Sequence, residues 1–200
     1  MIVYHIYRYA PESVKAYSGM QIGYEKDTSQ VDWFLPQVLP KESTGQFVKE
    51  YYPQGISRHG LYYLSPNMKN FRPDSVTENV FELVRQLNYS RMPSRFQSGF
   101  ACPDLDTAYR WCELFCSYPR EIWTVELSTP PLEFDSRFLQ SFVGKDFSPA
   151  LAVKSAHHYW QQDCTENPRL EVLLSLPFRL GKRIQSLPPQ PNTHDVSASS

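Results

Sequence analysis

The sequence lacks a surplus of charge of either sign and a long apolar run. Its 200 residues carry a formal net charge of −1. A protein that coats duplex nucleic acid normally has an excess of Lys and Arg, so any contact with nucleic acid is expected to be local. No apolar run approaches membrane-spanning length, and residues 1–13 lack the basic start and apolar core of a secretory signal. We therefore expect a cytoplasmic protein that makes no membrane contact.

Metal-binding spacings are also missing. The cysteines at 102, 112, 116 and 164 include no CxxC pair, and no histidine stands near them at zinc-ligand spacing. Cys112 and Cys116 are expected to share one helix face. His157 and His158 are adjacent, which is not the i, i+4 spacing of a helical metal site. The sequence therefore predicts buried, reduced thiols and no metal.

A regular βαβ rhythm, a glycine-rich nucleotide loop and internal repeats are absent as well. What is present is 41% hydrophobic and 14% aromatic residues, enough for one core in a single domain. The patterns predict strands at 2–8, 61–64, 94–102 and 122–128, two strand pieces within 170–184, and helices at 44–52, 75–89, 105–117 and 148–162.

Several local signals set the expected helix boundaries. Ser75 and Glu78 have the spacing of a capping box, and Asp104 or Asp106 caps the helix that follows. Pro149 suits a first helical turn. Residues 187–200 are rich in Pro and Ser and are expected to be a disordered tail. The prediction is one α+β domain at 1–186 followed by this tail.

Six strings carry a resemblance when they are taken in order. They are YHIYR (4–8), GISRHGLYYL (55–64), ENVFELVRQLNY (78–89), PSRFQSGFAC (93–102), AHHYW (156–160) and PRLEVLLSLPFRLGKRI (168–184). Over about residues 2–184 the chain resembles a poorly characterised bacterial family whose sequences look like ADP-ribosyltransferases, some of them toxin-like. The resemblance implies a split two-sheet fold with flanking helices around an NAD cleft.

The same resemblance implies a set of site residues. His5 or Arg8 matches the first-strand position, and Ser94, Arg95 and Ser98 match the middle strand. Glu171 matches the catalytic glutamate of a late strand. The Glu or Gln often found two residues before that glutamate is Arg169 here, which departs from arginine-modifying toxins.

The implied reaction splits the bond between nicotinamide and ribose through an oxocarbenium-like sugar, as in glycoside hydrolysis. Glu171 would bind the ribose 2′-hydroxyl and stabilise the developing cation. Arg95 or Arg8 would hold the pyrophosphate, and His5 a ribose hydroxyl.

Tyr62 or Tyr63 would stack on the nicotinamide, and Ser94 or Ser98 would orient it. Plainer roles remain open. Glu171 suits an exposed position on a half-buried strand, His5 a core position, and Arg95 an ion pair with a carboxylate such as Glu113.

Three functions follow, in order of preference. The first is an NAD-dependent mono-ADP-ribosyltransferase that modifies single-stranded RNA or a protein, with NAD as substrate. The resemblance implies a toxin for this case, restrained by an antitoxin or directed against phage. The second is a non-catalytic nucleotide-binding module. The third is a metal-independent ribonuclease built on Ser57, Arg58 and His59.

Overall fold

The computed structural model describes residues 1–8, 15–28, 44–64, 73–115, 117–140, 142–143 and 146–189. Helices and small antiparallel sheets are mixed in this part of the chain. The α+β class expected from the sequence is therefore confirmed. Residues 190–200, which hold most of the expected tail, and Cys116 lie outside the described residues.

The first sheet has the strand order β1–β4–β10. It contains β1 (Ile2–Arg8), β4 (Arg120–Glu126) and β10 (Arg183–Leu187). Val3 pairs with Val125, and His5 pairs with Trp123. Val3, Trp123 and Val125 are buried in one hydrophobic cluster. The strands predicted at 2–8 and 122–128 are thus confirmed, and Ile122, on the other face of this sheet, is buried in a second cluster.

The second sheet has the order β3–β8–β5. It contains β3 (Ser98–Ala101), β8 (Leu170–Ser175) and β5 (Glu133–Asp135). A single bridge between Tyr4 and Cys102 joins β3 to β1. Two-stranded pairs are formed by β2 (Gln21–Ile22) with β9 (Phe178–Arg179), and by β6 (Phe142–Val143) with β7 (Asp146–Phe147). The two larger sheets are therefore linked by one backbone bridge, and buried residues of both belong to one hydrophobic cluster.

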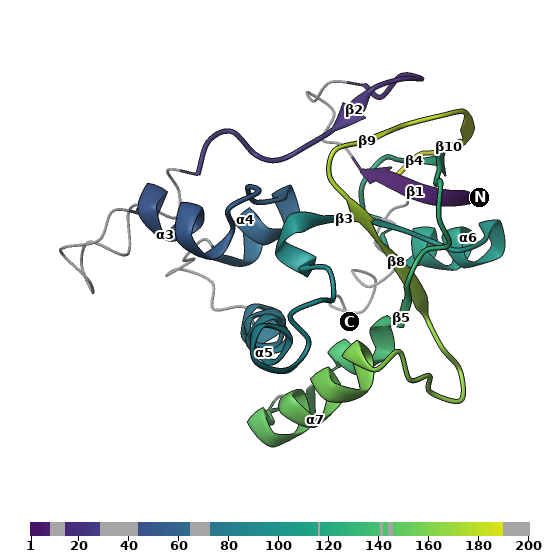
Figure 1. Cartoon of the computed structure of the whole chain (residues 1–200). Coiled ribbons are helices and arrows are strands. Elements are labelled where there is room, and N and C mark those ends of the chain that lie inside the picture. Colours follow the sequence, from purple (N-terminus) through teal and green to yellow (C-terminus); the bar gives the residue numbers. More distant parts are fainter. Residues whose placement is uncertain are drawn as a thin grey trace, which may run out of the picture.

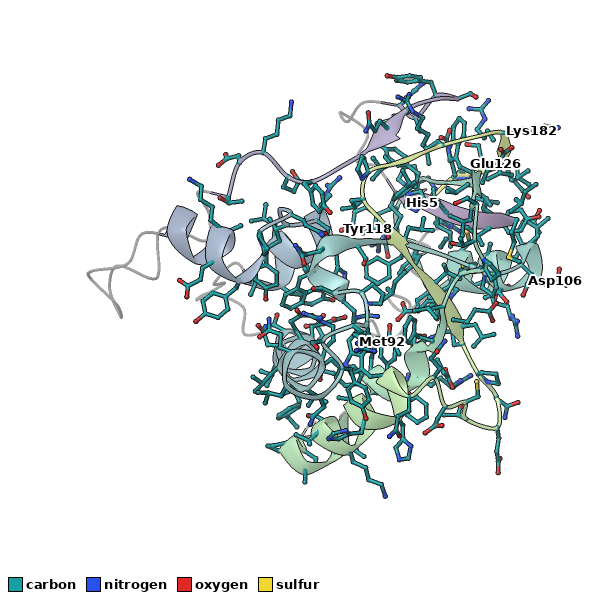
Figure 2. All side chains as sticks on the ribbon, viewed as in Figure 1. His5, Met92, Asp106, Tyr118, Glu126 and Lys182 are labelled. Atoms are coloured by element: carbon teal, nitrogen blue, oxygen red, sulfur yellow. The ribbon has the colours of Figure 1, made fainter. Side chains whose placement is uncertain are left out.

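Most helices lie on one side of these sheets, as Figure 1 shows: α3 (Thr44–Tyr51), α4 (Arg58–Leu64) and α5 (Pro73–Asn88), with α7 (Pro149–Trp160) beneath them. The helix α6 (Leu105–Leu114) lies beside the first sheet. The indole of Trp160 donates to the Phe81 carbonyl at 2.9 Å, which ties α7 to α5. Side chains fill the space between helices and strands, with Met92 on the helical side and His5 on the strand side (Figure 2).

Three sequence predictions about local structure are wrong. The segment 61–64 is helical and belongs to α4, so Tyr62 and Tyr63 do not point to opposite faces of a strand. Ser75 does not begin a capping box with Glu78, because α5 starts at Pro73. The stretch predicted as a strand from 94 begins instead with a 3₁₀ turn, η1 (Arg95–Gln97).

Other predictions are confirmed. Asp104 caps α6 by accepting a hydrogen bond from the Thr107 amide, and Pro149 lies in the first turn of α7 after the cap residue Ser148. In the helix predicted at 75–89, Phe81 and Val84 are buried, whereas Leu87 is 73% exposed.

No helix in the described ranges is long and apolar enough to cross a membrane. No group of three potential metal ligands occurs in these ranges either, and the absence of a metal stays a prediction.

Candidate functional site

The centre of the candidate site is a buried ion pair between Arg95 and Glu171. Ser94 caps η1 through its hydroxyl, which accepts from the Phe96 amide at 3.1 Å, and this turn aims Arg95 at the second sheet. Arg95 donates through Nη1 to Oε1 of Glu171. Only 3% of the Arg95 side chain and 6% of the Glu171 side chain are exposed. The open possibilities of an exposed Glu171 and of a pair between Arg95 and Glu113 are both wrong.

The two oxygens of Glu171 have different environments. Oε1 also accepts a hydrogen bond of 2.8 Å from the hydroxyl of Tyr159, on α7. Oε2 accepts none within the described ranges, and it is not among the buried polar atoms that lack a partner. It follows that the small exposed part of this carboxylate includes Oε2. The carboxylate is held rigidly by one oxygen and presents the other.

Arg95 is shared with a second carboxylate. Its Nε and Nη2 donate to the two oxygens of Glu78, on α5, at 2.8 and 2.9 Å. Burial would raise the pKa of Glu78, but Arg95 and His59 hold it well below the usual range. The pKa of Tyr159 is raised well above its ordinary value, mainly by burial, so its hydroxyl stays protonated and donates to Glu171.

All three nitrogens of Arg95 therefore donate within the protein. This geometry makes Arg95 a support for Glu171 and leaves it no free donor edge for a dinucleotide phosphate. Of the two arginines considered for the pyrophosphate, Arg8 is the one with an exposed side chain.

His59 extends the network toward the surface. Its ring lies 4.7 Å from the Tyr63 ring and 4.6 Å from the Phe100 ring. Its Nε2 is buried 3.3 Å from Oε2 of Glu78, without hydrogen-bond geometry. The hydroxyl of Ser57 accepts a hydrogen bond of 3.1 Å from the Gly60 amide at the start of α4. The ribonuclease built on Ser57, Arg58 and His59 stays a prediction.

His5, on β1, lies next to β3. Its Nδ1 donates to the carbonyl of Phe100 at 2.7 Å, and its ring meets the edge of Phe178 at 5.1 Å. Burial lowers the pKa of His5 to about 4, although the bond to Phe100 opposes the shift. The imidazole is therefore neutral at pH 7, and since a carbonyl only accepts, Nε2 is left with a free lone pair.

Glycine at position 99 permits this arrangement. A Cβ there would lie 2.4 Å from the ring of Phe178, so any other residue would displace that ring from β3 and from His5.

Phe100 links the residues that the sequence singled out. Its carbonyl binds His5, its ring lies 4.9 Å from the guanidinium of Arg95, and that guanidinium binds Glu171. Tyr63 joins through His59, and its hydroxyl donates to Asp74 at 3.2 Å. Tyr62 is 49% exposed and packs edge-on against Tyr63.

The remaining predicted residues have other surroundings. The hydroxyl of Ser98 donates to the Ser94 carbonyl at 2.7 Å, so both serines are used within the turn. Arg8 stacks on Phe115 with its Cζ 4.1 Å from the ring centre. The pKa of Arg8 is lowered from its ordinary value, mainly by partial burial of the guanidinium. Tyr63 opposes this shift, and the like charge of Arg58 adds to it, so Arg58 lies within electrostatic range of Arg8.

Comparison with known proteins adds a family. The model of a family described as "protein of unknown function (DUF2441)" matches residues 3–186. The chain belongs to this family. No curated protein matches the sequence. The matched range of this DUF2441 chain contains every residue of the site.

Sequence reasoning missed two members of the network. Tyr159 was visible only as part of AHHYW, and Glu78 was read as a capping residue. A glutamate inside an amphipathic helix on the same face as Phe81 and Val84 is the signal that could have identified Glu78, because such a position is buried.

Proposed function

We propose that this protein transfers ADP-ribose from NAD to a macromolecular acceptor. The observation that carries the proposal is the state of Glu171. One oxygen of this carboxylate is fixed by Arg95 and Tyr159, while Oε2 is left without a partner within the described ranges. A carboxylate held by one oxygen, with the other oxygen free, is the group needed to stabilise a developing sugar cation.

The reaction requires little else from the protein. The bond between ribose C1′ and the nicotinamide nitrogen breaks, and its electron pair leaves with nicotinamide, which becomes neutral. The acceptor forms the new bond to C1′ with its own lone pair and releases a proton. Glu171 Oε2 binds the 2′-hydroxyl and faces the cationic sugar at the point of greatest charge. Because nicotinamide leaves as a neutral molecule, no second carboxylic acid is needed.

The arrangement of the strands supports an ADP-ribosyltransferase-like fold. The two larger sheets are linked by the bridge of Tyr4 and Cys102, and His5 of the first sheet binds the Phe100 carbonyl of the second. The neutral imidazole offers Nε2 as an acceptor for a ribose hydroxyl. Arg8 supplies an exposed cation at the end of the same strand for the pyrophosphate, and Tyr63 an aromatic face beside His59.

The biological setting of the proposal rests on the resemblance alone. In this setting the protein is a toxin that an antitoxin restrains or that acts against phage. Its acceptor is single-stranded RNA or a protein. The ADP-ribosylating activity and this setting are separate proposals, and the first is tested without the second.

The test measures nicotinamide release from NAD by the purified protein. We expect release by the native chain and its loss, by a factor of about 100 or more, in Glu171→Gln. The matched control is Glu133→Gln, which alters an exposed glutamate on the neighbouring strand β5 and should retain full activity.

Folding and binding are checked in the same samples. Calorimetric titration with NAD separates loss of chemistry from loss of binding, and a thermal scan confirms that Glu171→Gln is folded. Full activity in folded Glu171→Gln contradicts the proposal. Binding of NAD without release by the native chain would instead establish the non-catalytic nucleotide-binding module.

A further inference from the structure

Two stacked aromatic rings with a guanidinium at each end lie along one face of α6. The guanidinium of Arg8 lies 4.1 Å from the ring centre of Phe115. Phe115 stacks on Trp111 with ring centres 5.4 Å apart and planes at 23°. The guanidinium of Arg169 lies 4.7 Å from the ring of Trp111. We call these four residues the cation–aromatic ladder.

The ladder is anchored at both ends by the fold. Trp111 donates its indole hydrogen to the carbonyl of Leu170 at 3.0 Å, and the Nε of Arg169 donates to Ser136 at 2.8 Å. Arg8 is the last residue of β1, and Arg169 immediately precedes β8. The ladder therefore runs between the strand that carries His5 and the strand that carries Glu171.

More positive charge extends the ladder. Arg58 lies within electrostatic range of Arg8, and Arg137 within electrostatic range of Arg169. The pKa of Arg169 is lowered mainly by burial and then by the like charge of Arg137. None of these four arginines is in an ion pair with a carboxylate within the described ranges. Because the chain as a whole has almost no net charge, these four arginines form a local surface that suits an anionic ligand.

Acidic residues of α6 do not neutralise this face. Glu113 is two residues beyond Trp111, just over half a turn around the helix, and Asp106 precedes Phe115 by about two and a half turns. Both therefore lie on the opposite side of α6. Asp135, near Arg169, is buried and accepts hydrogen bonds from Thr165 and from the amides of Arg137 and Arg169.

We propose that the end of the cation–aromatic ladder formed by Trp111 and Arg169, with Arg137 beside it, binds a single-stranded nucleic acid as the acceptor for the reaction at Glu171, while Arg8 at the other end holds the pyrophosphate of NAD. This rests on the proposed function for the identity of the reaction but not for the binding itself. Guanidinium groups neutralise successive phosphates, and unpaired bases stack on guanidinium planes and rings. Guanidinium groups on either side of stacked aromatic rings match the phosphates and bases of a single strand better than they match an acidic protein surface.

The experiment measures binding of labelled single-stranded RNA, and of DNA with the same sequence, by fluorescence anisotropy over a range of salt concentrations. The double variant Arg137→Gln with Arg169→Gln removes two cations outside the catalytic residues. Loss of two phosphate contacts should reduce the slope of log affinity against log salt by roughly 1.4 and weaken binding by roughly 25-fold at about 0.1 M salt. Arg91→Gln, an exposed arginine after α5, is the matched control.

Three outcomes would overturn the proposal: no salt-dependent binding of either single strand, equal weakening by Arg91→Gln, or equally tight binding of polyglutamate. Weaker NAD binding in the double variant would overturn it too, because this end of the ladder would then hold the pyrophosphate of the dinucleotide. Nicotinamide release is measured on the same proteins. Release without oligonucleotide binding refutes only the ladder, and oligonucleotide binding without release refutes only the enzymatic proposal.

Discussion

Arg95 and Glu171 form a buried ion pair although 76 positions separate them in the sequence. The guanidinium also binds Glu78, so one cation lies between two carboxylates from a helix and a strand. This pair connects the helical layer to the second sheet, and it fixes the carboxylate on which the proposed chemistry depends.

Replacing Arg95 should destabilise the protein strongly. Arg95→Met retains much of the side-chain volume but leaves Glu78 and Glu171 buried without their shared cation. Removal of one partner from a buried ion pair costs about 3–5 kcal/mol in the free energy of unfolding. Urea denaturation followed by circular dichroism measures this loss. Arg91→Met, at an exposed position, should change the same quantity by less than about 0.5 kcal/mol.

A loss below about 1 kcal/mol in Arg95→Met would show that the two carboxylates are neutralised in another way, for instance by taking up protons.

Tyr159 is expected to contribute through its hydroxyl as well as its ring. Tyr159→Phe keeps the stacking on Phe134, at 4.8 Å, but removes the donor to Glu171. The expected loss is about 1–3 kcal/mol of unfolding free energy, because a buried acceptor and donor lose their partner. Thermal unfolding compares this variant with Tyr17→Phe, whose ring is 61% exposed. Equal melting temperatures for the two variants would argue against a role for the hydroxyl.

His5 should make stability depend on pH. Its folded pKa of about 4 lies below the ordinary value of 6.5, so the unfolded chain binds more protons between these values. The contribution of neutral His5 is complete above pH 6.5 and is lost as the pH falls toward 4. For a partly accessible ring this is on the order of 2 kcal/mol.

The measurement is urea denaturation at several pH values in this window. His5→Asn should flatten the pH dependence, whereas His158→Asn, which removes a half-exposed imidazole beside Asp163, should leave it unchanged. An identical slope in native protein and His5→Asn would mean that His5 titrates normally.

The sequence predicts those features that depend on nearby residues. The β-branched and aromatic run at 2–8 and the cap at Asp104 each require only a few neighbouring positions, and both predictions are confirmed. The strand predicted at 61–64 is wrong. The aromatic residues of this segment favour a strand, but the Ser57 cap and the packing of Gly60 on η1 make it helical. That packing is a contact with Phe96, far along the chain.

The candidate site shows the same division. A role for Glu171 was inferred from a resemblance, but its burial and its partners come from helices and turns distant in sequence. Arg95 was predicted to bind a phosphate because the sequence does not distinguish an arginine with a free guanidinium from one that is shared by two carboxylates. Only the folded contacts distinguish these cases.

The packing of α4 on η1 leads to a prediction of opposite effects at two glycines. A Cβ at Gly60 would lie 2.4 Å from the Phe96 carbonyl oxygen and 2.8 Å from its Cα, both backbone atoms that cannot move without displacing η1. Alanine is favoured over glycine by about 1 kcal/mol in a helix interior, but overpacking costs about 1–3 kcal/mol. We expect Gly60→Ala to destabilise the protein and, by shifting η1, to reduce nicotinamide release.

Gly23→Ala is the matched control, since nothing lies within 4 Å of its added Cβ and its backbone needs no left-handed conformation. It should be neutral or stabilise by up to about 1 kcal/mol, because alanine restricts the unfolded chain. Urea denaturation of both variants gives the two signs directly. If Gly60→Ala were as stable as Gly23→Ala, α4 would not be in contact with η1, and His59 would lose its place between Tyr63 and Phe100.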